Sequence, residues 1–256
     1  MSDWNSNQYM KFKNERTQPS VDLINRISYL NPKNILDIGC GPGNSTFALK
    51  NQFGKSDIIG IDYSENMLEK AKATYPDIVF EKCNVPSGLK NYNQNFDLIF
   101  SNACIHWIDN QKDLISAMFG KLNTGGVLAV QIPLIQKAPF YEILYRLVKT
   151  SKWQKLSEIR NFHNLLPEEY YDLFCKLNCD FNIWQTTYYH IVPSHMGIIE
   201  WYKGSGLRPY LDMLSESERN EFIADLLNEL QSAFPIQADG KVILKMPRLF
   251  FTLTKK

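Results

Sequence analysis

The sequence predicts a single α/β domain with a mainly parallel sheet, helices on both of its faces and a helical cap. Short apolar runs alternate with helix-like segments over the first half of the chain, and a glycine-rich turn follows the first run. Strand-like composition then returns near the end. Because strands of a parallel sheet are buried on both faces, their sequences are expected to be continuously apolar.

Five strands and three helices are expected in the first half of the chain. The strands are expected at 34–38, 57–61, 78–83, 96–101 and 127–131. The helices between them are expected at 45–53, 65–74 and 111–122. Asn44 or Ser45 can cap the first helix and Ser64 the second, because a short polar side chain at this position accepts a backbone N–H. Strands that alternate with helices imply crossover connections and parallel pairing.

The pattern changes after Pro133. Helices are expected at 140–149, 167–177, 194–202 and 215–234, and strands at 181–190 and 241–254. We expect these two late strands to complete the sheet and to include an antiparallel one. The N-terminal segment 1–30 and the insertions at about 134–178 and 191–240 are expected to form a cap over the active site, within one domain that spans 1–256.

The composition argues against several classes of protein. With 256 residues and 44% hydrophobic residues, the chain can bury a sizeable core. Its net charge of +1 and its scattered lysines do not indicate nucleic-acid binding. The polar start does not resemble a signal peptide, and no apolar stretch is long enough to span a membrane. The five scattered cysteines lack metal-ligand spacing. We therefore expect a cytoplasmic protein, monomeric by default, with reduced thiols and no metal.

The loop from Asp37 to Gly43 is the most informative stretch, because it leaves a strand and enters a helix. Its glycines, Gly39, Gly41 and Gly43, allow a ligand to approach the backbone closely. The nicotinamide fingerprint G-x-G-x-x-G would place its last glycine at position 44, where this chain has Asn44. Asp37 suits a ligand with an ammonium group better than a pyrophosphate. The loop therefore favours S-adenosylmethionine over NAD and over an ordinary glycine-rich turn.

Further cofactor contacts are expected at the ends of the next strands. Asp62 can accept hydrogen bonds from ribose hydroxyls, although a turn aspartate is the alternative. Met67 could pack beside an adenine or in the core, and Asn84 could bind the adenine edge or form a turn. The segment 98–107 should border the transferable methyl group, and it lacks the motif with which nucleic-acid amino-methylating enzymes hold a flipped base. The complete expected set is Asp37, Gly39, Gly41, Gly43, Asp62, Tyr63, Met67, Asn84, Val85 and Asn102.

Motifs outside this common core are more specific. They are Trp184-Gln185-Thr186-Thr187-Tyr188-Tyr189-His190, Pro193-Ser194-His195, Gly206-Leu207-Arg208-Pro209 and Pro247-Arg248-Leu249-Phe250. With them the chain resembles the trans-aconitate 2-methyltransferase family, nearly end to end except over 134–166. The resemblance implies a Rossmann-like class I methyltransferase fold and methyl transfer from S-adenosylmethionine to one carboxylate of trans-aconitate or a closely related small polycarboxylic acid. The family usually has Asp at position 84 and Gln at position 106, where this chain has Asn84 and His106.

Such an acceptor is already ionised at neutral pH, so no general base is required and catalysis would consist mainly of positioning. We expect His106 and Tyr188 to position the acid. Arginine binds carboxylates bidentately. The two arginines of these motifs and the one in the N-terminal segment are therefore candidates for binding the carboxylates that do not react. The expected substrate-binding set is Arg16, His106, Trp107, Tyr188, His195, Arg208 and Arg248. Methylation of another small metabolite, or cofactor binding without catalysis, is the alternative.

Overall fold

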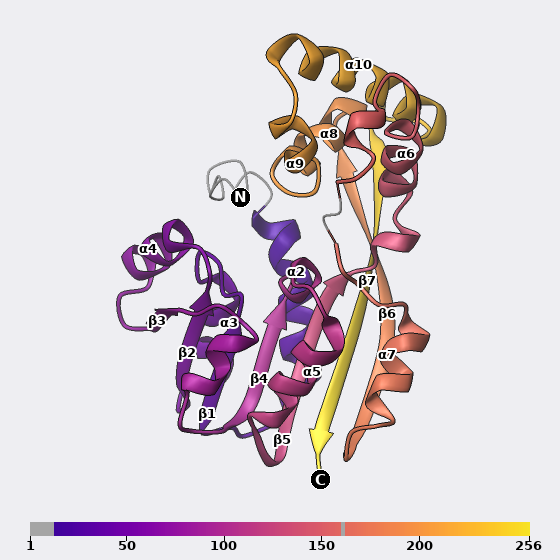
Figure 1. Ribbon diagram of the computed structural model, residues 1–256. Helices are drawn as coiled ribbons and strands as arrows, with labels where there is room; N and C mark the ends of the chain where they lie inside the picture. Colours follow the sequence, from indigo (N-terminus) through magenta and orange to yellow (C-terminus); the bar gives the residue numbers. More distant parts are fainter. Residues whose placement is uncertain (1–12, 160–161) are drawn as a thin grey trace.

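The computed structural model describes residues 13–159 and 162–256, with side chains from Thr17 onward. It contains a seven-stranded sheet in the order β3-β2-β1-β4-β5-β7-β6 (Figure 1). The strands are β1 Asn34–Ile38, β2 Asp57–Asp62, β3 Val79–Lys82, β4 Phe96–Asn102, β5 Leu122–Pro133, β6 Cys179–Val192 and β7 Val242–Lys255. The helices are α2 Lys13–Arg26, α3 Asn44–Gln52, α4 Glu65–Thr74, α5 Gln111–Gly120, α6 Pro139–Leu147, α7 Pro167–Phe174, α8 His195–Lys203, α9 Arg208–Asp212 and α10 Glu216–Ala233.

The pairing of the strands confirms the predicted fold class. Strands β1 to β5 pair in parallel, whereas β7 is antiparallel to both β5 and β6. Every strand expected from the sequence is present, and β5 is longer than expected because it begins at Leu122. All the expected helices are present as well, and the helices α2 and α9 were not anticipated.

One of the two predicted helix caps is confirmed. The hydroxyl of Ser64 accepts the backbone N–H of Met67 at the start of α4. The cap predicted for α3 was wrong, since Gly43 occupies the N-cap in a left-handed conformation with φ 88° and without a side-chain cap. The Ser45 hydroxyl donates to Asp37 instead. The Ser45 hydroxyl is thus bound to the buried Asp37 carboxylate and does not cap the helix.

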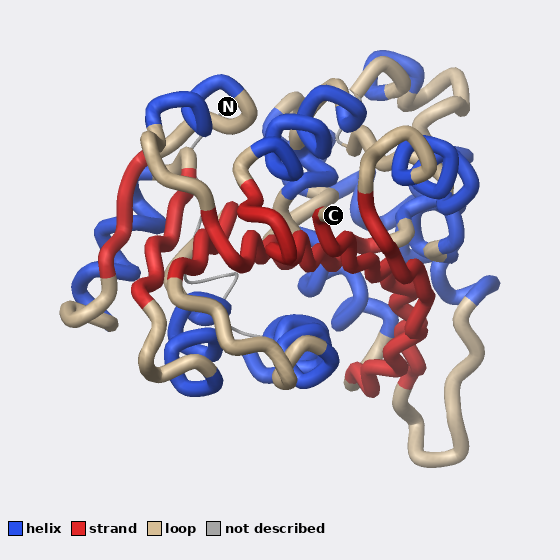
Figure 2. The backbone as a smooth tube through the Cα atoms, turned by 90° about the horizontal axis from the view of Figure 1, so that it is seen from below, coloured by secondary structure: helices blue, strands red, loops and turns tan. Residues whose placement is uncertain are grey.

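Helices cover both faces of the sheet (Figure 2). On one face, Leu23 and Ile24 of α2 pack with Ile35 of β1 and Phe100 of β4. On the other face, the apolar sides of α5 and α7 pack against the sheet in a second cluster. Both faces of the central strands are therefore buried, which explains their continuously apolar sequences.

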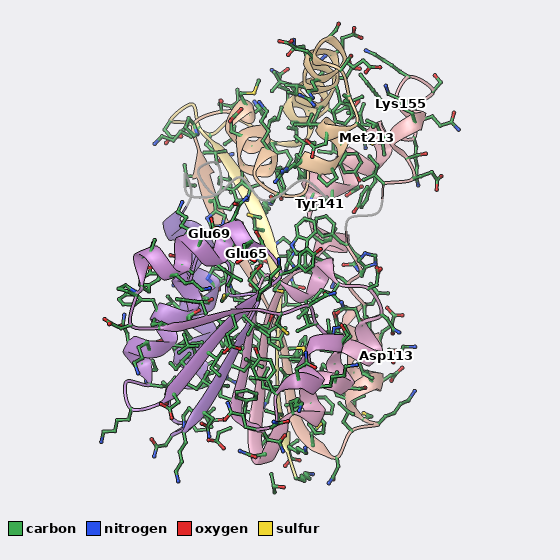
Figure 3. All side chains as sticks on the ribbon, turned by 60° about the vertical axis from the view of Figure 1, so that its left-hand side comes forward. Glu65, Glu69, Asp113, Tyr141, Lys155 and Met213 are labelled. Atoms are coloured by element: carbon green, nitrogen blue, oxygen red, sulfur yellow. The ribbon has the colours of Figure 1, made fainter. Side chains whose placement is uncertain are left out.

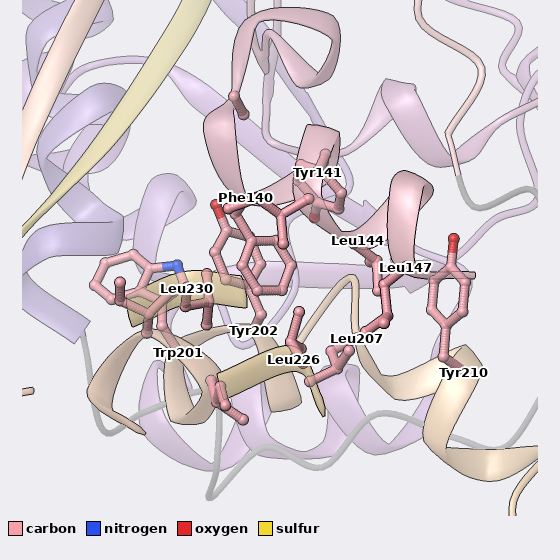
Figure 4. Close-up of a cluster of buried hydrophobic side chains, with 14 of the residues drawn as sticks. Phe140, Tyr141, Leu144, Leu147, Trp201, Tyr202, Leu207, Tyr210, Leu226 and Leu230 are labelled. Carbon is pink, nitrogen blue, oxygen red and sulfur yellow. The ribbon is translucent and has the colours of Figure 1, made fainter. Parts of the chain in front are cut away.

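A third cluster of buried side chains forms a separate helical layer beyond the sheet, which we call the cap (Figure 4). It comprises α6, α8, α10 and residues 207–214, together with the ends of β6 and β7 that extend beyond the other strands (Figure 1). At its centre the rings of Phe140 and Tyr202 stack with centroids 3.6 Å apart. The two fourteen-residue strands belong to both layers, so they connect the cap to the sheet.

The cap contains fewer segments than the sequence predicts. Within the expected insertion 134–178, Tyr170 and Phe174 of α7 pack in the core of the sheet. Within the expected segment 1–30, α2 lies on the sheet face, and residues 1–12 fall outside the described residues. An apolar helix face has the same sequence pattern whichever layer it packs against, so composition could not separate these helices.

Candidate active site

Asp37, near the end of β1, is completely buried. The hydroxyls of Ser45 and Thr46 both donate to its Oδ2, each at 2.7 Å. Its Oδ1 has no hydrogen-bond partner among the described residues. Burial raises the pKa of Asp37 to about 6, although the two hydroxyls oppose this shift. The carboxylate therefore offers one unused acceptor atom at the glycine loop, and a cationic group placed there would favour its ionised form.

The three glycines of the loop all have positive φ, but for different reasons. A Cβ on Gly39 would lie 2.1 Å from the Cys104 sulfur, so this glycine admits the segment that follows β4. A Cβ on Gly43 would lie 2.8 Å from the ring of Tyr75, and this glycine admits helix packing. Gly41 has open space around it. Of the three, Gly41 is therefore the one placed for close approach of a ligand.

Asp62 ends β2 and holds this loop in place. Its Oδ2 accepts the Gly41 N–H at 2.9 Å, and its Oδ1 accepts the Ser64 N–H at 2.9 Å. These two bonds place the Asp62 carboxylate between the glycine loop and the start of α4. Asp62 consequently joins the glycine loop and the start of α4 into one rigid edge.

The other expected cofactor residues are dispersed around this edge. Tyr63 is two-thirds exposed at 67%, whereas Met67 is buried on α4. Asn84 lines a surface hollow of about 500 Å³ beside β3, together with Lys90 and Tyr92. Val85 packs at the margin of the sheet core.

Four neighbouring strands each contribute one polar side chain to the same face of the sheet. We call these four residues the polar row: Asp37, Asn102, Gln131 and Arg248. The strand register places them together, because Asp37 pairs with Phe100 two residues before Asn102, and Asn102 pairs with Gln131. Gln131 in turn pairs with Phe250, two residues after Arg248. Paired residues and residues two apart share a face, so the row points to the α2 side.

Two further members of this row have unused hydrogen-bonding atoms. Asn102 Oδ1 and both amide atoms of Gln131 are buried without a partner among the described residues. Buried polar atoms are normally satisfied, and such a run of exceptions on neighbouring strands indicates a place for a ligand. The row begins beside the glycine loop and ends beneath the cap.

Beneath the cap, the row opens into a cleft between cap and sheet, which we call the sheet–cap cleft. Its lining residues come from the segment after β4, from β5 and β7, from α2, and from the helices and loops of the cap. They are Pro19, Ala103, His106, Trp107, Gln131, Pro133, Ile135, Ala138, Tyr141, Phe162, Trp201, Tyr202, Ser205, Met246, Pro247 and Arg248. Tyr141 stands where the cap meets the sheet (Figure 3). The walls are largely aromatic, and the polar atoms come mainly from the sheet.

His106 and Arg248 give this cleft its electrostatic character. His106 is buried with its Nδ1 unpartnered in the described part of the chain, and its ring stacks on Phe162 with centroids 5.5 Å apart. Burial holds the pKa of His106 well below its usual value, and the guanidinium of Arg248 lowers it further. The imidazole is therefore neutral at physiological pH. Arg248, with only 8% of its surface exposed, supplies positive charge at the cleft wall.

Tyr188 lies beside the cleft but does not line it. Its hydroxyl donates to the Asp22 carboxylate on α2, and burial together with this bond raises its pKa. This contact fixes α2 against β6, close to Pro19 at the cleft.

The structure does not bring every predicted substrate residue to the cleft. His195 is buried on α8, where its Nε2 pairs with the Phe234 carbonyl at 2.7 Å. Arg208 begins α9 with its Nε 3.6 Å from the Asp212 carboxylate. The side chain of Arg16 lies outside the described side chains. His106, Trp107 and Arg248 do line the cleft.

Sequence reasoning missed Gln131 and the aromatic residues Tyr141 and Tyr202. Gln131 leaves one signal, a single amide near the end of an otherwise apolar central strand. The aromatic residues leave none, since they are indistinguishable from core residues by pattern. The Gly206 motif also has a local reason, because a Cβ there would lie 2.1 Å from the Tyr141 hydroxyl.

No helix within 13–159 and 162–256 combines the length and apolar character that a membrane crossing requires. No cluster of three or more His, Cys, Asp or Glu with metal-binding geometry occurs in that part of the chain.

Comparison with known proteins places these features in a family. Residues 35–126 match the family described as "Methyltransferase domain". Among solved structures, the fold is similar to that of the YcgJ protein from Bacillus subtilis, with a TM-score of 0.61, 14% identity, and coverage of 93% of this chain and 99% of that one. It is also similar to phosphoethanolamine N-methyltransferase 2 from Haemonchus contortus in complex with S-adenosyl-L-methionine, with a TM-score of 0.58, 18% identity, and coverage of 93% and 52%. These likenesses support the class I methyltransferase fold.

The curated relatives are much closer in sequence. The trans-aconitate 2-methyltransferase of Rhodopseudomonas palustris strain BisB18 is 37% identical over 258 residues, which cover 100% of both chains. The enzyme of the same name from Escherichia coli O45:K1 is 38% identical over 253 residues, with coverage of 98% and 97%. The chain is therefore a methyltransferase, and it belongs to the trans-aconitate 2-methyltransferase family.

Proposed function

We propose that this protein methylates one carboxylate of trans-aconitate, or of a closely related small polycarboxylic acid, with S-adenosylmethionine as the methyl donor. The observation that carries the proposal is the polar row, which has acceptor atoms at one end and a buried guanidinium at the other. The names of the curated relatives support the same substrate.

The donor end fits S-adenosylmethionine. Its ammonium group needs an acceptor, and Asp37 Oδ1 is a buried carboxylate oxygen with no partner among the described residues. Its ribose hydroxyls need acceptors, and the Asp62 carboxylate lies at the end of β2 beside the glycine loop. Gly41 leaves room for its backbone to approach the ligand. When bound, S-adenosylmethionine supplies a methyl group activated by a sulfonium.

At the acceptor end, Arg248 would hold a carboxylate of the acid that does not react. A buried guanidinium suits this role because it donates two parallel hydrogen bonds to a carboxylate. His106 is held neutral, so it can donate or accept one hydrogen bond without adding charge. The reacting carboxylate is ionised at neutral pH, and no residue is required to remove a proton from it.

The aromatic walls would contribute by excluding water. Tyr141, Phe162, Trp201 and Tyr202 line the cleft opposite the sheet. The reaction joins a cation to an anion and so loses charge on the way to products, which a water-poor site favours. The continuous pairing of β6 and β7 between cap and sheet would help to hold the acid in line with the methyl group.

The proposal can be tested by incubating the purified protein with S-adenosylmethionine and a panel of di- and tricarboxylates, and identifying products by mass spectrometry. We expect a monomethyl ester of trans-aconitate, and we expect Arg248→Met to raise the KM for the acid. Arg146→Met is the matched control, because Arg146 is an exposed arginine on α6 that does not line the cleft. Tight cofactor binding without methylation of any acid would refute the proposal and favour another metabolite or a non-catalytic role.

A further inference from the structure

Gln131 is a completely buried amide on the central strand β5, between Val130 and Ile132. Neither its Nε2 nor its Oε1 has a hydrogen-bond partner among the described residues, although the side chain lines the sheet–cap cleft. Exchanging the two amide atoms would leave both still unpartnered, so the orientation of the amide does not matter here. An amide buried in this way is unfavourable unless a ligand or water completes its hydrogen bonds.

The surroundings of Gln131 point to an anionic ligand. Arg248 lies on the same sheet face, diagonally across the β5–β7 pair, where long side chains reach the same space. Of the described residues that line the cleft, Arg248 alone carries a fixed charge. The Ala103 N–H donates to the backbone oxygen of Gln131 at 2.9 Å, which ties the turn after β4 to this position.

We propose that Gln131 determines the specificity of the acceptor site: its amide and the Arg248 guanidinium together seat a carboxylate of the acid that is not methylated. This inference rests on the proposed function. A carboxylate there accepts hydrogen bonds from both the guanidinium and the amide N–H. A methyl ester or a primary amide in its place carries no charge and is a weaker acceptor. The seat thus selects acids that keep a second free carboxylate.

The test compares Gln131→Glu and Gln131→Met with the wild type. Gln131→Glu keeps the shape of the side chain but places a negative charge at the seat, and Gln131→Met removes the hydrogen bonds at similar volume. Gln185→Glu on β6 is the matched control, because it makes the same change at an exposed position on the same sheet. The probes are trans-aconitate and its mono-primary-amides, measured by steady-state kinetics and by calorimetry on the protein loaded with S-adenosylhomocysteine.

We expect the KM for trans-aconitate to rise about 10-fold in Gln131→Met and about 100-fold in Gln131→Glu, the size expected when a hydrogen bond to a charged group is lost or reversed. Affinity for S-adenosylhomocysteine should stay within about two-fold, and this binding also reports that the variants fold. Gln131→Glu should bind one mono-amide better than it binds the acid, because the added carboxylate accepts the amide N–H. If Gln131→Glu lowered the affinity for the acid and for every mono-amide equally, or changed neither affinity, the proposed role of Gln131 would be wrong.

Failure of the seat and failure of the proposed function give different results. If the wild type methylates the acid and the Gln131 variants match it, only the seat is wrong. If the wild type binds polycarboxylates without methylating them, and Gln131→Glu weakens that binding, the seat holds and the function is wrong. If the wild type binds no polycarboxylate, both are wrong.

Discussion

Replacing Asp37 by Asn is expected to stabilise the ligand-free protein at neutral pH while it weakens binding of the methyl donor. Asparagine has nearly the same shape, and its carbonyl oxygen can accept the Ser45 and Thr46 hydroxyls that now donate to Asp37 Oδ2. The change removes a buried negative charge. It also places an amide N–H where Oδ1 now offers a free acceptor.

The magnitude follows from the pKa of Asp37. Burial raises it from 3.8 to about 6. At about 1.4 kcal/mol per pKa unit, this corresponds to roughly 3 kcal/mol. Because the folded-state pKa lies above the unfolded one, the neutral carboxyl contributes stability that is fully present below pH 3.8 and is lost as the pH rises through 6. At pH 7.5 the asparagine variant should therefore be more stable by up to roughly 3 kcal/mol, or about 6–12 °C in Tm for a chain of this size.

Thermal melts of the ligand-free protein at pH 7.5 and near pH 4.5 would measure this effect, with calorimetry of S-adenosylhomocysteine for binding. The difference in Tm should shrink as the pH falls from 6 toward 4, because the wild-type carboxyl becomes neutral there. Asp57→Asn is the control, since Asp57 is exposed at the start of β2. A variant that melts no higher than wild type at pH 7.5, or a difference independent of pH, would refute the reasoning.

Three other substitutions have defined outcomes. Asp62→Ala should reduce affinity for S-adenosylhomocysteine at least about 10-fold, because it removes the ribose acceptor and the bond to the Gly41 N–H; unchanged affinity in calorimetry would show that the ribose assignment is wrong. Arg208→Ala should leave the KM for the acid within about two-fold, since Arg208 is not among the described residues that line the sheet–cap cleft; a 10-fold rise would place Arg208 in the acceptor site. Gly206→Ala should lower stability by about 1–3 kcal/mol, because its Cβ would lie 2.1 Å from the Tyr141 hydroxyl. Tyr141→Phe in the same chain should recover part of that loss in thermal melts.

The geometry of the proposed donor end could be predicted from the sequence because its signals are local. Asp37 and the glycine loop are consecutive, and both the strand before them and the helix after them follow from short-range pattern. Asp62 likewise ends an apolar run, so its place at the sheet edge follows from the strand. Even here the roles of Gly39 and Gly43 were hidden, since their neighbours Cys104 and Tyr75 are distant in sequence.

The acceptor end could not be predicted in the same way. Gln131 and Arg248 are brought together only by the β5–β7 register, across more than a hundred residues. His195 and Arg208 belong to motifs as distinctive as that of Arg248, yet of the three only Arg248 is among the described residues that line the sheet–cap cleft. A sequence motif does not show whether a residue binds substrate or stabilises the cap, because both roles can be filled by the same residue type.

In the proposed reaction, the polar row would set the spacing between the methyl donor and the acid. Asp37 on β1 and Gln131 on β5 are separated by one strand, β4, so two interstrand spacings of about 4.8 Å lie between their strands. Asn102 on β4 occupies the middle, where its Oδ1 lacks a partner among the described residues. A donor anchored at Asp37 and an acid seated at Gln131 would thus meet above β4. Since the sheet sets this spacing, catalysis by positioning depends on strand register, and a substitution that disturbs the β4–β5 pairing should lower kcat more than it changes either binding constant.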